Sequence, residues 1–512
     1  MAAFHRYLRK RPVSSFGLIG GSGAISYTLY VEYQAERSEE RHRLDETVKA
    51  FTLPRAYDAD GLNNYWSIRP VSTAKRFGKI MYELVPLAGA YIKDFKLQTP
   101  TDKETTEAKQ MALAERLREA LTNLGPAFVK AGQQLSIRPD LVPPVVLKEL
   151  QKLCDAVRPI PDEIALNLIR DELGEQDLEV LFQDIRLVAS ASLGQVYKAT
   201  LRENGHEVAI KVQRPDMKLH FSLDLFLLQN VGIVVDAFTA AFTNQPPFHK
   251  ALYESFASGS YSELDYENEA ANQIRFKKEF AIRKCPVVVP DVYQELTTQK
   301  VLTSQWIEGQ KLADSPKEDI RRLIGVGVEL FLTQLLDIGE FHADAHAGNL
   351  IVTQDGQLCL LDFGLCVKID EKSRNAMTKA IVHLITRDFE SLVSQDAKEL
   401  GFLPQDFDTS ELKPLLTKIL TVGIVDSGSD LRIRKRKLME ISNELNEVFF
   451  QYPFSVPPFF ALVTRGLGLL EGIALTGDPD FDIFRASAPY ARRRAVALLG
   501  SHGLRRLSGT AN

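Results

Sequence analysis

The residues best suited to chemistry in this 512-residue chain lie within residues 339–365. His342, Asp344 and Asn349 fall in one short loop, and Asp362 begins an Asp-Phe-Gly sequence a little further on. A loop carboxylate such as Asp344 can orient an attacking nucleophile. Mg²⁺ takes hard oxygen ligands together with phosphate oxygens, which Asn349, Asp362 and ATP would supply. The pattern therefore predicts a site for ATP and Mg²⁺.

A β-hairpin is predicted between these two polar groups. Residues 350–352 and 358–361 are apolar, strand-like runs joined by a polar turn that contains Asp355 and Gly356. An Asp, an Asn five positions later, and an Asp-Phe-Gly beyond a hairpin is how protein kinases place a catalytic carboxylate and two magnesium ligands. The competing interpretation is a buried hairpin with surface carboxylates, which we disfavour because the whole set occurs at this spacing.

A second strand-rich region covers residues 187–212. Its pattern is strand, small-residue turn, strand, Asn-Gly hairpin, strand. The turn, which lets backbone amides approach phosphates closely, consists of Ala189, Ser190, Ala191 and Ser192, followed by residues 193–195. Lys211 lies near the end of a Val-Ala-Ile-Lys strand, the position from which a kinase lysine contacts the α- and β-phosphates. Taken alone, Lys211 would be read as a lysine on the polar face of a strand.

Residues 253–280 are predicted to form one long helical region with several acidic side chains. At 3.6 residues per turn, Glu263 and Glu269 would lie about 120° apart around its axis. One helix could then offer carboxylates to two different lysines. The competing interpretation is a solvated acidic face.

Residues 301–309 read as a strand that runs into a linker between lobes, where backbone groups at Gln305 and Ile307 could meet an adenine edge. Residues 319–336 form a strongly apolar helix expected beneath the catalytic loop. Beyond residue 370 the chain is expected to be mainly helical. Residues 457–475 are apolar but interrupted by Arg465 and Glu471, which predicts a core helix rather than a membrane span.

The composition is that of an ordinary globular protein, with 45% hydrophobic and 25% charged residues. A net charge of only −5 gives no reason to expect a nucleic-acid partner. Four cysteines without CxxC spacing are expected to be reduced core thiols rather than a metal site or a disulfide framework.

The N-terminus has the composition of an organelle presequence, because basic residues are frequent and no acidic residue precedes Glu32. Residues 16–31 are mostly apolar and contain Gly17 and Gly21, a spacing that suits close helix packing in lipid. They are somewhat short for the roughly 20 residues that a bilayer span requires. A membrane anchor, a cleavable presequence and a soluble amphipathic cap all stay open, and an anchor would allow a dimer through Gly17 and Gly21.

A helical extension is expected before the strands. Residues 58–96 and 107–124 show helical patterns, and Pro126 can begin a further helix at its first turn. That helix carries Lys130, Gly132 and Gln133 between apolar positions. On its own, Lys130 reads as a solvated lysine.

Together these residues resemble the UbiB/ADCK (aarF-domain) family of atypical kinases over residues 58–490. The motifs that carry the resemblance are Lys130-x-Gly132-Gln133, the alanine-rich turn 189–192, Glu263-x-Asp265, Glu269, Lys211, Asp344, Asn349 and Asp362. The segments LSIRPDLVPP and LLEGIALTGDPDFD look most like the cyanobacterial and plastid-type branch. One departure is that the family's HADPHPGN reads HADAHAGN here, so both prolines are alanine and the loop is expected to be less rigid.

The resemblance implies an α+β, two-lobed protein-kinase-like fold with a family-specific helical extension and a helical C-lobe. The expected parts are a targeting segment and candidate membrane anchor (1–34), a helical extension with the Lys-x-Gly-Gln motif (35–180), an N-lobe with a helical insertion (181–310), a C-lobe (311–495) and a basic tail (496–512). It further implies a Lys211–Glu269 ion pair that positions ATP. A Lys130–Glu263 pair is implied as well, with regulatory helices lying across the site where a protein substrate would bind.

The resemblance also implies a role at a membrane in isoprenoid-quinone or other lipid metabolism, with a quinone precursor and quinone-biosynthesis proteins as partners. The short basic leader favours the mitochondrial inner membrane, and the branch resemblance favours the plastid. Our hypothesis is an atypical kinase or ATPase in which Asp344, Lys211 and Glu269 are catalytic. The rivals are an ATP-gated scaffold or lipid-binding protein without turnover, and a protein Ser/Thr kinase, against which stands the lack of an Ala-Pro-Glu sequence after Asp362.

Overall fold

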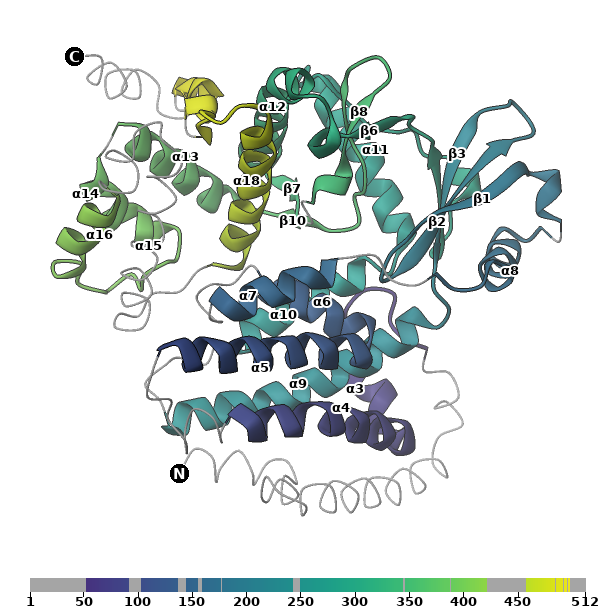
Figure 1. Ribbon diagram of the computed structural model, residues 1–512, viewed down its shortest axis with the longest axis horizontal. Helices are drawn as coiled ribbons and strands as arrows, with labels where there is room; N and C mark the ends of the chain where they lie inside the picture. Colours follow the sequence, from purple (N-terminus) through teal and green to yellow (C-terminus); the bar gives the residue numbers. More distant parts are fainter. Residues whose placement is uncertain are drawn as a thin grey trace.

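Two lobes and a layer of helices make up the computed structural model of the chain (Figure 1). The structure describes residues 52–91, 103–136, 144–154, 159–175, 177–242, 249–343, 346–386, 388–420, 457–483, 485–490, 492–494 and 496–497. Several predictions concern residues outside these ranges, namely the leader with Gly17 and Gly21, Asp344 in the loop, and most of the basic tail. Within the described ranges, no helix has both the length and the apolar character needed to cross a bilayer.

The N-lobe is a four-stranded antiparallel sheet in the order β1-β2-β3-β5. Its strands are β1 (Phe182–Ser190), β2 (Gly194–Leu201), β3 (Glu207–Gln213) and β5 (Val301–Gln305). Helix α8 (Asp162–Leu173) packs on the sheet through Ile169, which shares a fully buried core with Tyr197 and Ile210. Because side chains alternate along a strand, burying Ile210 turns Lys211 to the opposite face of β3.

The C-lobe is mainly helical and encloses two small sheets, β10-β7 and β4-β9-β8-β6. Its strands are β4 (Val287–Val288), β6 (Gly309–Lys311), β7 (Glu340–His342), β8 (Leu350–Thr353), β9 (Leu358–Leu360) and β10 (Cys366–Lys368). Its helices are α12 (Lys317–Leu332) with a π-helical continuation (Thr333–Ile338), α13 (Glu371–Ile385), α14 (Phe389–Ser391), α15 (Ala397–Glu399), α16 (Leu412–Leu420) and α18 (Pro458–Gly477). The predicted hairpin is confirmed, because β8 and β9 pair antiparallel from Leu350↔Leu360 to Val352↔Leu358.

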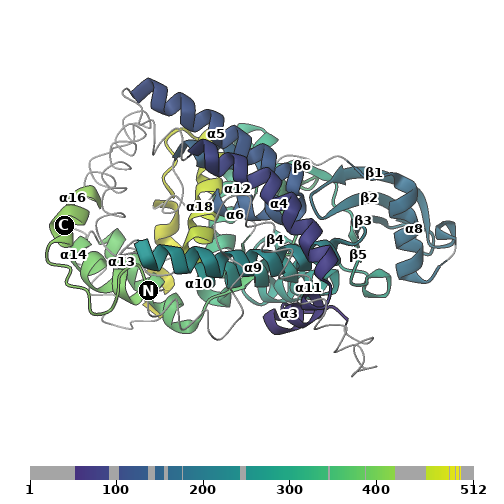
Figure 2. The ribbon, with the colours of Figure 1, turned by 90° about the horizontal axis from the view of Figure 1, so that it is seen from below.

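A layer of helices lies below the two lobes, and the view from below shows α4, α5 and α9 crossing this face (Figure 2). It combines α3 (Ala59–Ser67), α4 (Pro70–Tyr91), α5 (Lys103–Leu124), α6 (Pro126–Leu135) and α7 (Pro144–Gln151) with α9 (Met217–Phe242) and α10 (His249–Ser262). One buried cluster joins Phe128 of α6, Leu150 of α7 and Leu223 of α9. The helices before the N-lobe and those inserted into it therefore share a core.

The predicted single helix over residues 253–280 is wrong. Helix α10 ends at Ser262, and α11 (Tyr266–Ile282) begins after Asp265, whose side chain accepts a hydrogen bond from the Glu267 amide at 3.1 Å. Asp265 has extended backbone angles and caps α11. Glu263 therefore lies in the break between two helices, and the 120° argument does not describe its direction.

The small-residue turn is shorter than predicted. Ala189 and Ser190 belong to β1, where they pair with Val196 and Gln195 of β2. The chain reverses at residues 191–193, and the Ala191 amide donates to the Gly194 carbonyl at 2.8 Å. This hydrogen bond closes the turn.

Candidate active site

A cavity of about 280 Å³ lies where the N-lobe, the C-lobe and the helical layer meet. The turn after β1, the centre of β3, the start of α11, the Asp-Phe-Gly segment, helix α6 and helix α18 all contribute to its walls. The charged residues that line it are Lys130, Lys211, Glu263, Glu269, Asp362 and Arg465. Segments far apart in sequence thus bring charged or polar groups to one space.

Lys211 is the centre of this cluster. Its Nζ lies 2.8 Å from Oε1 and 2.9 Å from Oε2 of Glu269, and 3.6 Å from Oδ2 of Asp362. The ammonium group also lies 5.1 Å from the centre of the Tyr266 ring, within the range of a cation–π contact. Lys211 of β3 therefore lies between two carboxylates, Glu269 of α11 and Asp362 of the Asp-Phe-Gly segment.

Burial and charge compete in this cluster. Burial alone would lower the pKa of Lys211, but the negative charges of Asp362 and Glu269 outweigh it and raise that pKa well above its usual value. Burial would raise the pKa of Asp362, yet the charge of Lys211 and other neighbours hold it well below the usual range. Burial raises the pKa of Glu269, although Lys211 opposes the shift. At neutral pH, Lys211 and Asp362 are accordingly both charged.

The Asp-Phe-Gly segment is fixed from two sides. Phe363 is fully buried, with its ring 5.6 Å from that of Phe276, and its carbonyl accepts a hydrogen bond from Asn272 at 3.0 Å. Asp362 has a φ of 63°, which is uncommon for a residue with a side chain, and its Oδ1 accepts from the Gly364 amide at 2.9 Å. Left-handed backbone costs about 1–3 kcal/mol and persists only where the surroundings enforce it. Packing of Phe363 supplies that enforcement and directs Asp362 into the cavity.

Helix α6 brings a second lysine to the cavity. Lys130 Nζ lies 2.6 Å from Glu263 Oε2, and the two side chains are only 7% and 9% exposed. A Cβ on Gly132 would come within 2.5 Å of a Leu153 methyl group, so glycine is required for the close packing of α6. The side-chain amide of Gln133 donates to the Leu153 carbonyl at 2.8 Å. In this chain the Lys-x-Gly-Gln sequence thus seats α6 and carries Lys130 to the cavity wall.

The small-residue turn lines the N-lobe side of the cavity through Ser190, Ala191 and Ser192, whereas Ala189 is not among the lining residues. Arg214 holds the turn, because its guanidinium donates to the Ala191 carbonyl at 3.1 Å and to Ser190 Oγ at 3.0 Å. Gly194 also lies against backbone, since a Cβ there would be 2.4 Å from the Val212 carbonyl oxygen.

Other predicted site residues lie outside this cavity. The Gln305 amide donates to the Asp291 carbonyl at 2.7 Å, and neither Gln305 nor Ile307 lines the cavity, so an adenine contact there stays a prediction. Asp265 caps α11 and forms an ion pair with Arg55 at 2.8 Å. In the structure Asp265 therefore organises the helix break instead of lining the site.

Asn349 is buried in a smaller adjoining pocket of about 40 Å³, together with His342 and His346. Its carbonyl accepts a hydrogen bond from the Leu361 amide at 2.9 Å, which places it beside the chain just before Asp362. Of these residues, His346 lines both spaces. A backbone hydrogen bond therefore places Asn349 next to the residue before Asp362. The two residues nevertheless line different pockets, so the shared metal site stays a prediction.

Three polar residues that the sequence analysis did not assign to the site also line the cavity, namely Tyr266, His346 and Arg465. Tyr266 follows the helix break and could not be placed without it. His346 follows Asp344 closely in the loop, and Arg465 interrupts an apolar helix. A charge inside an apolar helix was the available signal for Arg465.

The donor set around Asp362 fits a magnesium ion that is also bound by phosphate. Within the described residues, no group of three or more His, Cys, Asp or Glu side chains could hold a metal by itself. Mg²⁺ usually takes only one or two carboxylates and completes its shell with substrate phosphates and water. Asp362, charged and directed into the cavity, offers one such hard ligand.

A strand lysine paired with a helix glutamate, next to an Asp-Phe-Gly segment between two lobes, defines a protein-kinase-like domain. Residues 152–396 match the model of the "ABC1 atypical kinase-like domain". The chain belongs to the ABC1 (aarF-domain) atypical kinase family, which confirms the family resemblance and the two-lobed α+β fold.

Similar proteins come from plastids and cyanobacteria. The chain is 38% identical to Protein ACTIVITY OF BC1 COMPLEX KINASE 3, chloroplastic, of Arabidopsis thaliana, over 88% of this chain and 63% of that protein. It is 35% identical to Uncharacterized protein sll0005 of Synechocystis, over 86% of this chain and 63% of that protein. It is 36% identical to Uncharacterized protein slr1919 of Synechocystis, over 86% and 76% respectively. The expected cyanobacterial and plastid-type branch is confirmed, although the chain spans less than two thirds of the first two relatives.

The fold likeness extends to a solved structure, described as the complex of Rv3197 with erythromycin from Mycobacterium tuberculosis. The similarity has a TM-score of 0.51 at 23% identity and covers 75% of this chain and 97% of the other. At that identity the comparison supports the fold alone.

Proposed function

We propose that this protein binds Mg²⁺-ATP in the cavity between its lobes and transfers or hydrolyses the terminal phosphoryl group. The observation that carries the proposal is Lys211, held 2.8 Å from Glu269 and 3.6 Å from Asp362. Charged groups fixed in advance stabilise the transition state of phosphoryl transfer, because little reorganisation is needed during the reaction.

Each residue of the site has a separate task in this proposal. Lys211 neutralises the α- and β-phosphates, with Glu269 fixing its direction. The turn with Ser190 and Ala191 would cover the phosphates, and Asp362 would hold the metal, with Asn349 as the proposed second ligand. When bound, Mg²⁺ would screen the negative charge of the phosphates. Asp344 orients the nucleophile, whether water or a small hydroxyl, and the bond from the terminal phosphorus to the ADP oxygen breaks as the new P–O bond forms.

The acceptor is proposed to be a small molecule or water rather than a protein. The family resemblance implies helices lying across the site where a protein substrate would bind, and the position of Lys130 of α6 in the cavity wall supports this. This leaves ATP hydrolysis, or transfer to a small hydroxyl group, as the favoured chemistry. An ATP-gated scaffold without turnover is the alternative that the experiment below excludes or supports.

We further propose a role at a membrane, in the metabolism of an isoprenoid quinone or another lipid, with quinone-biosynthesis proteins as partners. Relatives named chloroplastic favour the plastid over the mitochondrial inner membrane. Imaging a fluorescent fusion of residues 1–60 tests the location, since mitochondrial signal would contradict the plastid assignment.

ATP turnover in the presence of lipid vesicles and a quinone-precursor mimic tests the activity. Removing one preorganised charged group commonly costs about 10²–10³-fold in rate, so Asp362→Asn is expected to abolish most turnover. Asp355→Asn is the matched control, because Asp355 is exposed in the hairpin turn away from the cavity. Equal rates for the wild type and Asp362→Asn, with nucleotide still bound, would favour the scaffold.

A further inference from the structure

Arg465 reaches the cavity from α18, an element that carries none of the kinase-like motifs. It is half-buried and lines the same space as Lys211 and Asp362. More than a hundred residues separate it from Asp362 in the sequence. Its presence therefore depends on how α18 packs.

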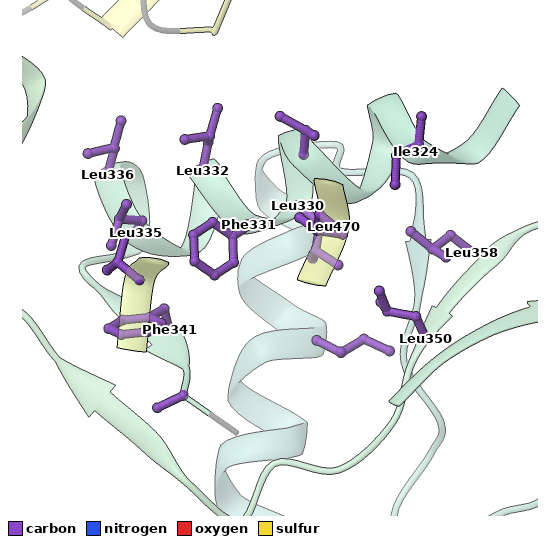
Figure 3. Packing of buried hydrophobic residues seen from close by; sticks show 14 of the residues in the cluster. Ile324, Leu330, Phe331, Leu332, Leu335, Leu336, Phe341, Leu350, Leu358 and Leu470 are labelled. Carbon is purple, nitrogen blue, oxygen red and sulfur yellow. The ribbon is translucent and has the colours of Figure 1, made fainter. Parts of the chain in front are cut away.

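The packing of α18 is close, and its glycine next to Arg465 makes it so. A Cβ on Gly466 would come within 2.4 Å of the Phe331 ring of α12. Helix α12 contributes a glycine to the same contact, because a Cβ on Gly327 would come within 3.1 Å of Leu470 of α18. Figure 3 shows Leu470 beside Leu330 and Phe331. Because α12 and α18 are in such close contact, the position of Arg465 is fixed by a buried core.

The charges that line the cavity indicate that Arg465 can bind a negatively charged group. Among the described residues, three cations and three carboxylates line it. The three cations come from three different elements, Lys130 from α6, Lys211 from β3 and Arg465 from α18. A nucleotide brings several further negative charges. A guanidinium suits them, since its planar set of donors matches the geometry of phosphate oxygens.

The place of Arg465 indicates which phosphate it meets. Lys211 and the small-residue turn come from the N-lobe, whereas Arg465 comes from the C-lobe, as do Asp362 and His346. His346 follows Asp344, the proposed orienting carboxylate, by two residues. The C-lobe side of the cavity is therefore where the phosphoryl group would react.

We propose that Arg465 binds the terminal phosphoryl group of the bound nucleotide. This inference rests on the proposed function, because it names a further residue of the same site. It makes discrimination between ATP and ADP depend on a residue outside the kinase-like motifs.

Direct binding of Mg²⁺-ATP and Mg²⁺-ADP to the full chain tests the proposal. Arg465→Gln is expected to weaken ATP binding at least tenfold and ADP binding less than threefold, and Arg465→Lys should restore part of the loss. Arg493→Gln is the matched control, because Arg493 pairs with Glu329 at 2.9 Å on the surface and its side chain is 69% exposed. The control should bind both nucleotides like the wild type.

The ratio of the two affinities separates a specific contact from general damage. If Arg465→Gln leaves the ATP-to-ADP ratio unchanged, whether by weakening both or neither, the inference is wrong and the proposed function stands. If the wild type binds neither nucleotide, the proposed function fails and this inference fails with it. Thermal melts without nucleotide verify that each variant is folded.

Discussion

The buried pair of Lys130 and Glu263 should behave unlike a surface ion pair. Lys130 Nζ and Glu263 Oε2 lie 2.6 Å apart, and both side chains are less than a tenth exposed. Removing one partner of such a pair leaves an uncompensated buried charge, which commonly costs about 3–5 kcal/mol. We therefore expect Lys130→Met or Glu263→Gln alone to lower the free energy of unfolding by about this amount. The double variant should recover most of the loss, because no charge is then left without its partner.

Urea unfolding of the four proteins measures the coupling between the two residues. A coupling energy of at least about 2 kcal/mol is expected, within the range observed for residues in direct contact. Lys277→Gln is the control, because Lys277 pairs with Asp291 at 2.5 Å but both side chains are well exposed, and such pairs contribute about 0–1 kcal/mol. If the single variants cost no more than the control, the pair is solvated and its assignment as a buried ion pair that stabilises the fold is wrong.

Three further predictions concern packing and ionisation. Gly466→Ala should destabilise the protein by about 1–3 kcal/mol, since its Cβ meets Phe331, whereas Gly468→Ala, with no atom within 4 Å, should be neutral or stabilise by up to about 1 kcal/mol in thermal or urea unfolding. Burial raises the pKa of Cys359 to about 12, so at pH 8 about one thiol in ten thousand is ionised. Peptide-resolved labelling should find it inert until denaturant is added, and fast native labelling would contradict its burial. The pKa of Asp362 is lowered in the folded state, so its stabilising contribution is present above its unfolded value and lost as pH falls through the folded one. The unfolding free energy of the wild type relative to Asp362→Asn should hold from pH 7 to about 5 and fall below about pH 4, whereas no change down to pH 3 would contradict the shift.

Local periodicity was enough to predict the elements that carry most of the motifs. The β8–β9 hairpin and strand β3 follow from apolar runs and turn residues within short windows, and Lys211 is placed by the alternation along β3. The apolar pattern around Lys130 likewise predicted helix α6. In each case neighbours in sequence determine the conformation, so the sequence signal is strong.

The break between α10 and α11 was missed because residues 253–280 read as one helical region in the sequence. The available signal was Asp265, followed by Glu267 and Glu269 in the first helical turn, which is the pattern of a capped helix start. These acidic residues were interpreted as a solvated face or as partners of lysines, and a helix cap was therefore not considered. The cavity residues Tyr266 and Arg465 could not be assigned from pattern alone, since both depend on packing between distant elements.

The helix break also explains how two lysines from different layers meet carboxylates only six residues apart. On one continuous helix, Glu263 and Glu269 would diverge, and their partners would have to approach from separate directions. The capped break leaves Glu263 with Lys130 of α6, while Glu269 in the first turn of α11 holds Lys211 of β3. A Cβ on Gly364 would lie 3.4 Å from Oε2 of Glu269 and 3.7 Å from Cγ of Glu263, so both side chains lie beside the Asp-Phe-Gly segment. A movement of α6 that separated Lys130 from Glu263 would therefore disturb a side chain that lies beside Gly364. Glu269, the partner of Lys211, lies beside the same glycine. The helical layer is thus coupled to the site through packed atoms.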